Sequence, residues 1–376
     1  MGVCGLYNSK LSLLICIFCL IVFCVLTWTK MEDPTSFKPR QINDQHRVDF
    51  GVRVTPSQSG TPLDGGPTQQ QNDFQKRRES QNAGQKEQGN GEISEPYGFM
   101  EQQAVVQSER RRHLREVCSN HPELSQGSIN AITLRNLFVQ HKSKIIFCAV
   151  PKNGCSNWKR VAMVLGGVYN QTEDIPLREA HMDTGLKRLI QLSPAERNRT
   201  LQTYTKFMYA RQPFLRLLSA YLDKFEGKAA SRQGQYLRDI AKGIMRRYRK
   251  NATTRDLQTG ENITWYEWMT YLTNQTERAD FDPHWLEIHK LCSPCQINYD
   301  YMGKLETVDD DARYMLTSLE VQDKVNFPTG DEHQTNSSQA YSTYFGRVTM
   351  ASLQRLWEVY KLDFELFGYD NPSPFL

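Results

Sequence analysis

The clearest pattern of apolar and polar positions lies in residues 144–167, KIIFCAVPKNGCSNWKRVAMVLGG. Residues 145–150 form an almost continuous apolar run of strand length, typical of a parallel sheet that is covered on both faces. Pro151 and Gly154 then indicate a loop. After the loop, apolar residues recur at helical spacing. They are Trp158, Val161, Ala162 and Leu165.

This order of strand, tight loop and amphipathic helix indicates an anion site. Such a loop presents backbone N–H groups and a helix N-terminus to an anion, usually a phosphate. Lys152 lies at the turn, where its ammonium can reach whatever the loop holds. We expect Ser156 or Asn157 to cap the helix. The loop is not a Walker A motif, because GxxxxGK[ST] is absent.

A second unit of the same kind begins at residues 205–211, TKFMYAR, which resemble a strand. Pro213 suits the first turn of a helix. Arg211 at the strand end and Ser219 in the helix can meet one anion together, and arginine offers the bidentate geometry that phosphate prefers. The helix carries one apolar stripe. It consists of Phe214, Leu217, Leu218, Tyr221, Leu222 and Phe225.

These motifs resemble those of a known family. PKNGCSNWKR is similar to the 5′-phosphosulfate loop of Golgi carbohydrate sulfotransferases, and RQPFLRLLSAYLDKF to their 3′-phosphate motif. The branch concerned contains the chondroitin, dermatan and N-acetylgalactosamine 4-O-sulfotransferases and a glucuronyl 3-O-sulfotransferase. Further similarity lies downstream, in MRRYRKNAT, HWLEIHKLCSPCQINYDYMGKLET and YKLDFELFGY. The resemblance covers roughly residues 118–370.

The resemblance implies a fold and a reaction. The fold is α/β, a P-loop-like sulfotransferase fold with a mostly parallel central sheet flanked by helices. The reaction is transfer of a sulfuryl group from 3′-phosphoadenosine-5′-phosphosulfate (PAPS) to a sugar hydroxyl, without a metal. Position 4 of N-acetylgalactosamine in chondroitin or dermatan is the first expectation. Position 4 of terminal N-acetylgalactosamine on N-glycans and position 3 of glucuronate are the alternatives.

The resemblance also assigns roles in the donor site. Lys152 should stabilise the charge that develops on the departing phosphate. Arg211 and Ser219 should hold the 3′-phosphate, and Arg216 is the more exposed alternative. The family usually has Asp or Glu after this arginine, whereas this chain has Gln212, a position expected to orient the arginine. The remaining loop residues should cradle the 5′-phosphosulfate. They are Pro151, Asn153, Gly154, Cys155, Ser156 and Asn157.

The general base is expected to be a histidine, since its pKa lies near neutrality. His181, between the two donor motifs, matches a histidine of the chondroitin and dermatan 4-O-sulfotransferases and is the first candidate. His284 is the rival. Glu306, at the end of the expected strand YDYMGKL, is a third possibility that can instead brace an arginine.

The N-terminal part predicts a type II membrane protein. Residues 11–28 are uncharged and just long enough to span a bilayer, after a cytoplasmic tail of residues 1–10; a cleaved signal peptide is the alternative. All six N-x-[ST] sequons follow this segment and favour a lumenal domain in the Golgi. The sequons begin at Asn170, Asn198, Asn251, Asn262, Asn274 and Asn336.

Residues 29–113 are rich in polar residues, Gly and Pro, so we expect a disordered stem, with the lumenal sulfotransferase domain at residues 114–376. Cys292 and Cys295 have C-x-x-C spacing, but no second pair completes a zinc site, and disulfides are favoured in an oxidising compartment. The sequence does not show whether Cys292 and Cys295 pair with each other or with distant cysteines. With Cys118, Cys148 and Cys155 the lumenal cysteines number five, an odd count that leaves one thiol over.

The formal net charge of +4 does not indicate a general polyanion binder, and no nucleic-acid partner is expected. The basic residues within 246–250 either grip an acidic glycan or form a solvated helix end. The sequence does not predict the oligomeric state. The chain lacks the sequence signatures expected of a kinase. A non-catalytic glycan-binding glycoprotein is disfavoured because Lys152, Arg211 and Ser219 are all present.

Overall fold

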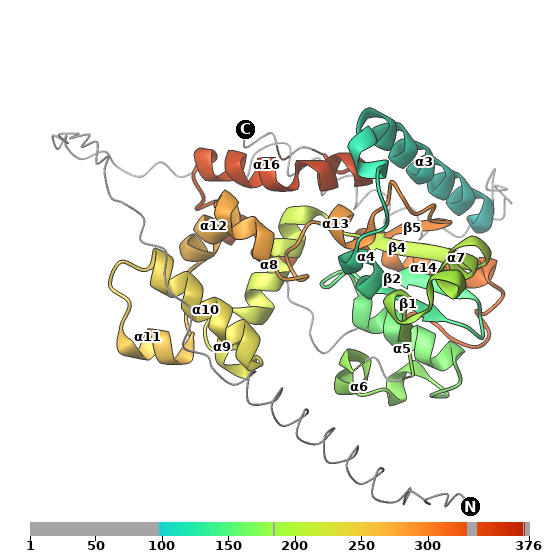
Figure 1. Cartoon of the computed structure of the whole chain (residues 1–376), viewed down its shortest axis with the longest axis horizontal. Helices are drawn as coiled ribbons and strands as arrows, with labels where there is room; N and C mark the ends of the chain where they lie inside the picture. The colour runs from blue at the N-terminus through green and yellow to red at the C-terminus, as the bar shows by residue number, and fades with distance from the viewer. Residues whose placement is uncertain (1–97, 183–184, 329–336, 371, 373–376) are drawn as a thin grey trace, which may run out of the picture. The chain divides into compact units, whose positions relative to one another are not determined.

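The computed structural model describes residues 98–182, 185–328, 337–370 and 372. Its centre is a five-stranded sheet in the order β3-β1-β2-β4-β5 (Figure 1). The strands are β1 (Leu137–Gln140), β2 (Ile145–Cys148), β3 (Lys187–Arg188), β4 (Thr205–Ala210) and β5 (Tyr301–Lys304). The two strands expected before the anion loops are therefore confirmed as β2 and β4.

The sheet is mixed rather than mostly parallel. β2 pairs with β4, and β4 with β5, in parallel, whereas β1 is antiparallel to both β2 and β3. The reason is connection length, since residues 141–144 join β1 to β2 as a short hairpin and only longer crossovers allow parallel pairing. The parallel half carries both anion motifs.

Helices cover both faces of the sheet, as expected for this α/β class (Figure 1). On one face, α5 (Cys155–Leu165) and α14 (Val308–Ser318) enclose a cluster that contains Phe147 and Phe207. On the other, α8 (Pro213–Lys224) and α16 (Met350–Phe367) pack with Ile146 and Met208. This alternation along β2 and β4 follows from the two-residue period of a strand.

The remaining helices pack around these elements, α6 (Leu177–His181) against α5 and α12 (Trp265–Thr273) against α16. The buried Trp268 of α12 contacts Phe225 and Trp285, so this helix packs its tryptophan into the core. The other α-helices are α4 (Ala131–Asn136), α7 (Pro194–Thr203), α9 (Ala229–Arg232), α10 (Gln235–Tyr248), α11 (Thr254–Thr259), α13 (Ile288–Cys292) and α15 (Ser337–Phe345).

The folded domain begins earlier than residue 114, because α3 spans Phe99–Asn120. Gln107 pairs with the backbone of Met302 on β5, accepting from its N–H at 2.8 Å. Arg110 donates to Asp311 at 2.7 Å. Polar side chains rather than apolar surface hold this part of α3. Low apolar content, which predicts a disordered stem up to residue 113, therefore does not detect it. The expected tail, membrane span and most of the stem lie outside the described residues.

Across the ranges that the structure describes, no helix is long and apolar enough to cross a membrane.

The two C-x-x-C cysteines form separate disulfides. Cys295 joins Cys118 of α3, and Cys292 joins Cys148 at the end of β2. Each bridge therefore closes a long loop of the chain, which restricts the unfolded state. Cys155 is the free thiol among the described cysteines.

Gly303 of β5 lies opposite Tyr209 of β4, and a Cβ at this position would overlap the Tyr209 ring. Gly303→Ala should therefore lower the free energy of unfolding by about 1–3 kcal/mol, because the buried ring must shift. Thermal unfolding measures this. Gly243→Ala in α10, where the new Cβ would meet only the end of the Arg247 side chain, is the control and should not destabilise. Equal Tm values for the two variants would contradict the close contact.

Candidate active site

The loop between β2 and α5 has the geometry of an anion site. Lys152 and Gly154 both adopt left-handed backbone conformations, with φ of 72° and 75°. Gly154 is the N-cap of α5, without a side-chain hydrogen bond, so the expected cap by Ser156 or Asn157 is wrong. The first N–H groups of an α-helix have no acceptor within the helix. Those of Cys155 and the next two residues are therefore available to a ligand.

The two asparagines of the loop hold its shape. Asn153 is buried, and its Nδ2 donates to the carbonyl oxygen of Tyr209 at 2.9 Å. Its Oδ1 is buried with no hydrogen-bond partner among the described residues. Asn157 donates to the Pro328 carbonyl at 3.3 Å and accepts from Arg160 at 3.1 Å. Ligand contacts from this loop are therefore left mainly to the backbone, Lys152 and Ser156.

Lys152 forms an ion pair that the motif did not predict. Its Nζ lies 2.9 Å from Oδ2 of Asp223 on α8, and the same oxygen lies 3.0 Å from Nζ of Lys224. Burial lowers the pKa of Lys152, and Asp223 opposes this shift. Burial would raise the pKa of Asp223, but the two lysines outweigh it and lower this pKa to about 2. Asp223 is thus ionised and favours the charged form of Lys152.

Arg211, at the end of β4, is directly against the loop. Its Nη1 donates to the carbonyl oxygen of Lys152 at 2.7 Å, and its Nη2 donates to Oγ of Ser337 at 2.8 Å. Burial lowers the pKa of Arg211 to about 10, with Glu306 acting against the shift. Ser219 lies on α8 and is buried. The structure thus brings the two motifs together through Arg211.

Gln212 and Glu306 stabilise the start of α8. The Gln212 side chain accepts from the N–H of Leu215 at 2.7 Å, so it caps the helix. Glu306 accepts from the N–H of Gln212 at 2.8 Å and from the Tyr369 hydroxyl at 2.9 Å. Both carboxylate oxygens of Glu306 are therefore engaged, and the carboxylate lies close enough to Arg211 to influence its charge.

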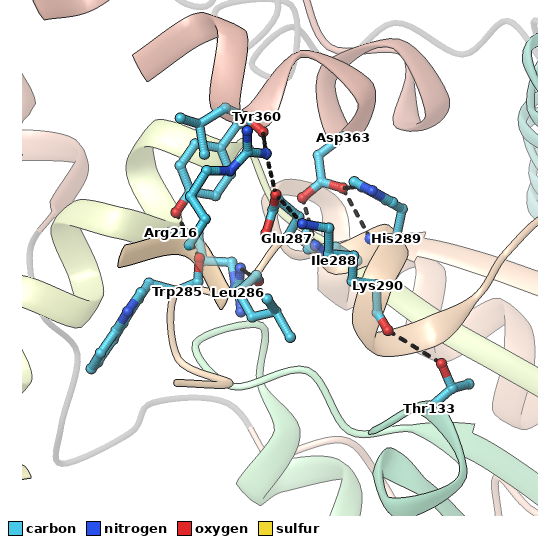
Figure 2. Close-up of polar contacts among 12 residues, drawn as sticks. Thr133, Arg216, Trp285, Leu286, Glu287, Ile288, His289, Lys290, Tyr360 and Asp363 are labelled. Atoms are coloured by element: carbon cyan, nitrogen blue, oxygen red, sulfur yellow. Dashed lines mark hydrogen bonds and ion pairs between the residues drawn. The ribbon is translucent and has the colours of Figure 1, made fainter. Parts of the chain in front are cut away.

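Arg216 is not the exposed residue expected from the sequence, since only 1% of it is accessible to solvent. Its guanidinium donates to the carbonyl oxygens of Pro151 (3.1 Å), Leu286 (2.7 Å) and Pro283 (2.6 Å). Figure 2 shows it beside Leu286. One buried side chain therefore joins the donor loop to residues 283–286.

The two candidate histidines differ in how they are held. His181 is the last residue of α6 and is exposed. Partial burial of its ring, with Lys159 and Lys224 nearby, lowers its pKa. His284 Nδ1 lies 2.5 Å from Oδ1 of Asp282. Burial lowers the pKa of His284, and Asp282 opposes this shift. Asp282 thus supports His284, while His181 is an exposed residue at the end of α6.

The basic cluster does not act as one unit. Arg249 is bound by Glu267 at 2.7 Å and Asp256 at 2.9 Å, so it stabilises the fold. Arg246 and Lys250 are exposed.

The asparagines of the six sequons differ in their exposure to solvent. Asn274 is half-buried, and its Nδ2 donates to the Tyr248 hydroxyl at 2.9 Å. Asn336 lies outside the described residues. The exposed sequon asparagines are Asn170, Asn198, Asn251 and Asn262.

Sequence reasoning missed Asp223, the buried role of Arg216, which it named only as an alternative for the 3′-phosphate, and Asp282. A signal existed for the first two, because Arg216, Ser219 and Asp223 are spaced i, i+3, i+7 and share one face of α8. No comparable pattern marks Asp282, which meets the site only through the tertiary fold. Within the described ranges, no group of three or more His, Cys, Asp or Glu side chains could hold a metal ion.

Comparison with known proteins agrees with this geometry. A family model described as "Sulfotransferase family" matches residues 135–370. The chain is 37% identical to carbohydrate sulfotransferase 11 of Danio rerio over 276 residues, covering 72% of this chain and 78% of the relative. It is 35% identical to carbohydrate sulfotransferase 8 of Mus musculus over 274 residues, covering 71% of this chain and 64% of the relative. Carbohydrate sulfotransferase 10 of Xenopus laevis is 35% identical over 280 residues, with coverages of 72% and 78%.

The family model and the relatives thus show that this chain is a sulfotransferase, and the fold and the loop fit this class. The chain belongs to the Golgi carbohydrate sulfotransferase family, as the motifs predicted, and it is an enzyme. No solved structure matches it. The family implies PAPS as the sulfate donor. The residues present fit such a donor, since a helix N-terminus, Lys152 and Arg211 converge where the donor's anionic groups would bind.

Arg216→Leu should lower the free energy of unfolding by about 3 kcal/mol or more, because three buried carbonyl oxygens lose their donor. Urea unfolding followed by tryptophan fluorescence measures the change. Arg246→Leu removes an exposed arginine of α10 and should leave the urea midpoint nearly unchanged. A small effect of Arg216→Leu would show that other groups satisfy these carbonyls.

Proposed function

We propose that this enzyme transfers the sulfuryl group of PAPS to position 4 of N-acetylgalactosamine in chondroitin or dermatan. The observation that supports the PAPS-binding part of this proposal is the hydrogen bond from Arg211 to the backbone of Lys152, at 2.7 Å. Because β2 and β4 are parallel, both anion motifs lie at the carboxyl ends of these strands, where open α/β sheets bind their ligands.

The donor roles follow from the positions of these residues. The N–H groups at the start of α5 receive the 5′-phosphosulfate, together with Gly154 and Ser156. Pro151 has no N–H and accepts from Arg216 through its carbonyl oxygen, so it shapes the loop at the donor site. Arg211 and Ser219 hold the 3′-phosphate. Lys152 donates to the bridging oxygen as negative charge grows on it. A bound donor would compete with Asp223 for Lys152, because an anion replaces the carboxylate as partner of the ammonium.

The acceptor half is supported by family similarity and by charge. The relatives are carbohydrate sulfotransferases with different numbers, and their names do not state a sugar. Arg246 and Lys250 are exposed at the end of α10 and can attract an acidic chain. Position 4 of terminal N-acetylgalactosamine on N-glycans and position 3 of glucuronate are the alternatives within the same reaction.

We also propose that the enzyme is a single-pass type II protein of the Golgi membrane, with this domain in the lumen. Two disulfides support an oxidising compartment, since such bonds are rare in the cytosol. The exposed sequons at Asn170, Asn198, Asn251 and Asn262 are compatible with glycosylation there. Asn274, whose amide is bound to Tyr248, is the sequon least suited to a glycan.

Sulfate transfer by the purified full-length protein tests the proposal. The protein is incubated with radiolabelled PAPS and, separately, desulfated chondroitin, desulfated dermatan, glycans ending in N-acetylgalactosamine, and glucuronyl acceptors. Label at position 4 of chondroitin or dermatan is the expected result. Label on another acceptor would correct the substrate. Folded protein that neither transfers label nor binds the product 3′-phosphoadenosine-5′-phosphate (PAP) would overturn the proposal.

Lys152→Ala should lower kcat on the order of a hundredfold or more, because a preorganised cation is lost where charge develops. Steady-state transfer assays measure kcat, and circular dichroism checks the fold. Lys142→Ala removes an exposed lysine after β1 and should keep normal turnover. Normal turnover in Lys152→Ala would exclude Lys152 from the chemical step.

Arg211→Ala should raise the KM for PAPS far more than the KM for the glycan, because the bidentate donor to the 3′-phosphate is lost. Titration with PAP should show the same loss of affinity. Arg135→Ala, which removes an exposed arginine of α4, is the control and should bind PAP normally. An unchanged dependence on PAPS would refute the assignment of the 3′-phosphate site.

A further inference from the structure

We propose that His284, oriented by Asp282, is the general base that takes the proton of the acceptor hydroxyl. This inference rests on the proposed sulfuryl transfer and names a residue other than His181, the first candidate from the sequence. Two observations support it: the Asp282 carboxylate contacts the His284 ring, and the buried Arg216 joins residues 283–286 to the donor loop.

The Asp282 carboxylate sets the orientation of the imidazole. The same Oδ1 accepts from the backbone N–H of His284 at 2.9 Å and lies 2.5 Å from its ring Nδ1. Asp282 is itself buried. Because a carboxylate accepts hydrogen bonds, the neutral ring carries its proton on Nδ1, and the lone pair lies on Nε2. Nε2 has no hydrogen bond to any described residue, and 27% of the side chain is accessible.

His284 lies on the donor side of the molecule. Lys152 and Lys224 are close enough to act on its charge, as is Asp282. His284 in turn affects the charge of His181, so the two histidines lie in the same part of the molecule. The lysines are those paired with Asp223 beside the loop. A hydroxyl between Nε2 and the sulfuryl group would meet the base on one side and the donor on the other.

A buried network fixes the segment that carries His284. Arg216 donates to the carbonyl oxygens of Pro283 and Leu286, which flank this histidine, and to that of Pro151, which precedes Lys152. The Tyr360 hydroxyl donates to the Trp285 carbonyl at 2.6 Å (Figure 2). The segments that carry the base and the catalytic lysine are therefore tied to one guanidinium, whereas His181 is the exposed last residue of a five-residue helix. Arg216 is a positioning residue.

The same segment contains a natural comparison. His289 Nδ1 lies 2.8 Å from Oδ1 of Asp363, which also accepts from the N–H groups of Ile288 and His289 (Figure 2). This second His–Asp pair ties α13 to α16 in the core, and only 9% of the His289 side chain is accessible. Two similar pairs thus differ in environment, since one lies beside the donor loop and the other is enclosed.

The proposed step is balanced. The acceptor oxygen attacks sulfur while its proton passes to Nε2 of His284, so one O–S bond forms and one O–H bond breaks. The bond between sulfur and the bridging phosphate oxygen breaks, and its electron pair stays on that oxygen as part of PAP. Lys152 donates a hydrogen bond to this oxygen. The products are the sulfated sugar, PAP and the imidazolium of His284, which returns its proton to solvent.

His284→Ala should lower kcat by at least about a hundredfold while PAP binding is kept, because general-base catalysis contributes on that scale. Added imidazole should restore part of the rate. His289→Ala is the matched control, in which any loss should follow the loss of folded protein and should not respond to imidazole. Retained kcat in His284→Ala, or loss without rescue, would overturn the proposal. Rescue seen in His181→Ala alone would assign the base to His181.

Asp282→Asn gives an independent test if His284→Ala folds poorly. Burial lowers the pKa of His284, Asp282 raises it, and Lys224 and Lys152 lower it further; His181 of α6 is the other titratable group whose charge is coupled to that of His284. Without the carboxylate the pKa of His284 falls, so the acidic limb of the kcat profile should move to lower pH as kcat decreases. A purely structural role would lower kcat without moving this limb, and that result would overturn the proposal. Wild-type protein that binds PAP but transfers to no acceptor would refute the proposed function instead.

Discussion

The active site depends on the buried guanidinium of Arg216. A charged group that is almost fully excluded from water is costly unless its donors are satisfied. Here the acceptors are carbonyl oxygens from the loop after β2 and from residues 283–286, segments far apart in the chain. Neither segment has regular backbone hydrogen bonding of its own at these positions, so Arg216 satisfies both. The same contacts fix the distance between the donor loop and the segment that carries His284.

The sheet supplies the second constraint. Parallel pairing of β2 with β4 brings the ends of both strands to one edge, so Lys152 and Arg211 meet although they lie in separate motifs. The antiparallel β1 lies on the other side of β2, with Leu137 beside Cys148. Cys148, at the end of β2, is bonded to Cys292, which lies after the His284 segment. A covalent bond and a buried charge therefore hold the same two parts of the chain.

Local features of the sequence predicted much of this arrangement. The strand, loop and helix around Lys152, and those around Arg211, follow from apolar periodicity and from Pro and Gly. The sequence did not predict the role of Arg216, because a charged residue beside an apolar stripe is usually exposed. Nor could it predict the early start of α3 or the disulfide partners, since these depend on contacts between distant residues. His181 was favoured over His284 by family similarity, whereas the carboxylate beside His284 becomes visible only in the fold.

The ion pair between Lys152 and Asp223 links the resting site to the chemistry. A lysine in a largely buried site tends to lose its proton, yet a neutral amine could not stabilise a departing phosphate. Asp223 favours the charged form before the donor arrives, with Lys224 on the same carboxylate. The negative charge of the donor can then take over this role, so the ammonium is never left without a counterion. In the proposed reaction, Lys152 is therefore already charged where the departing phosphate develops its charge, and His284 takes the proton of the acceptor hydroxyl.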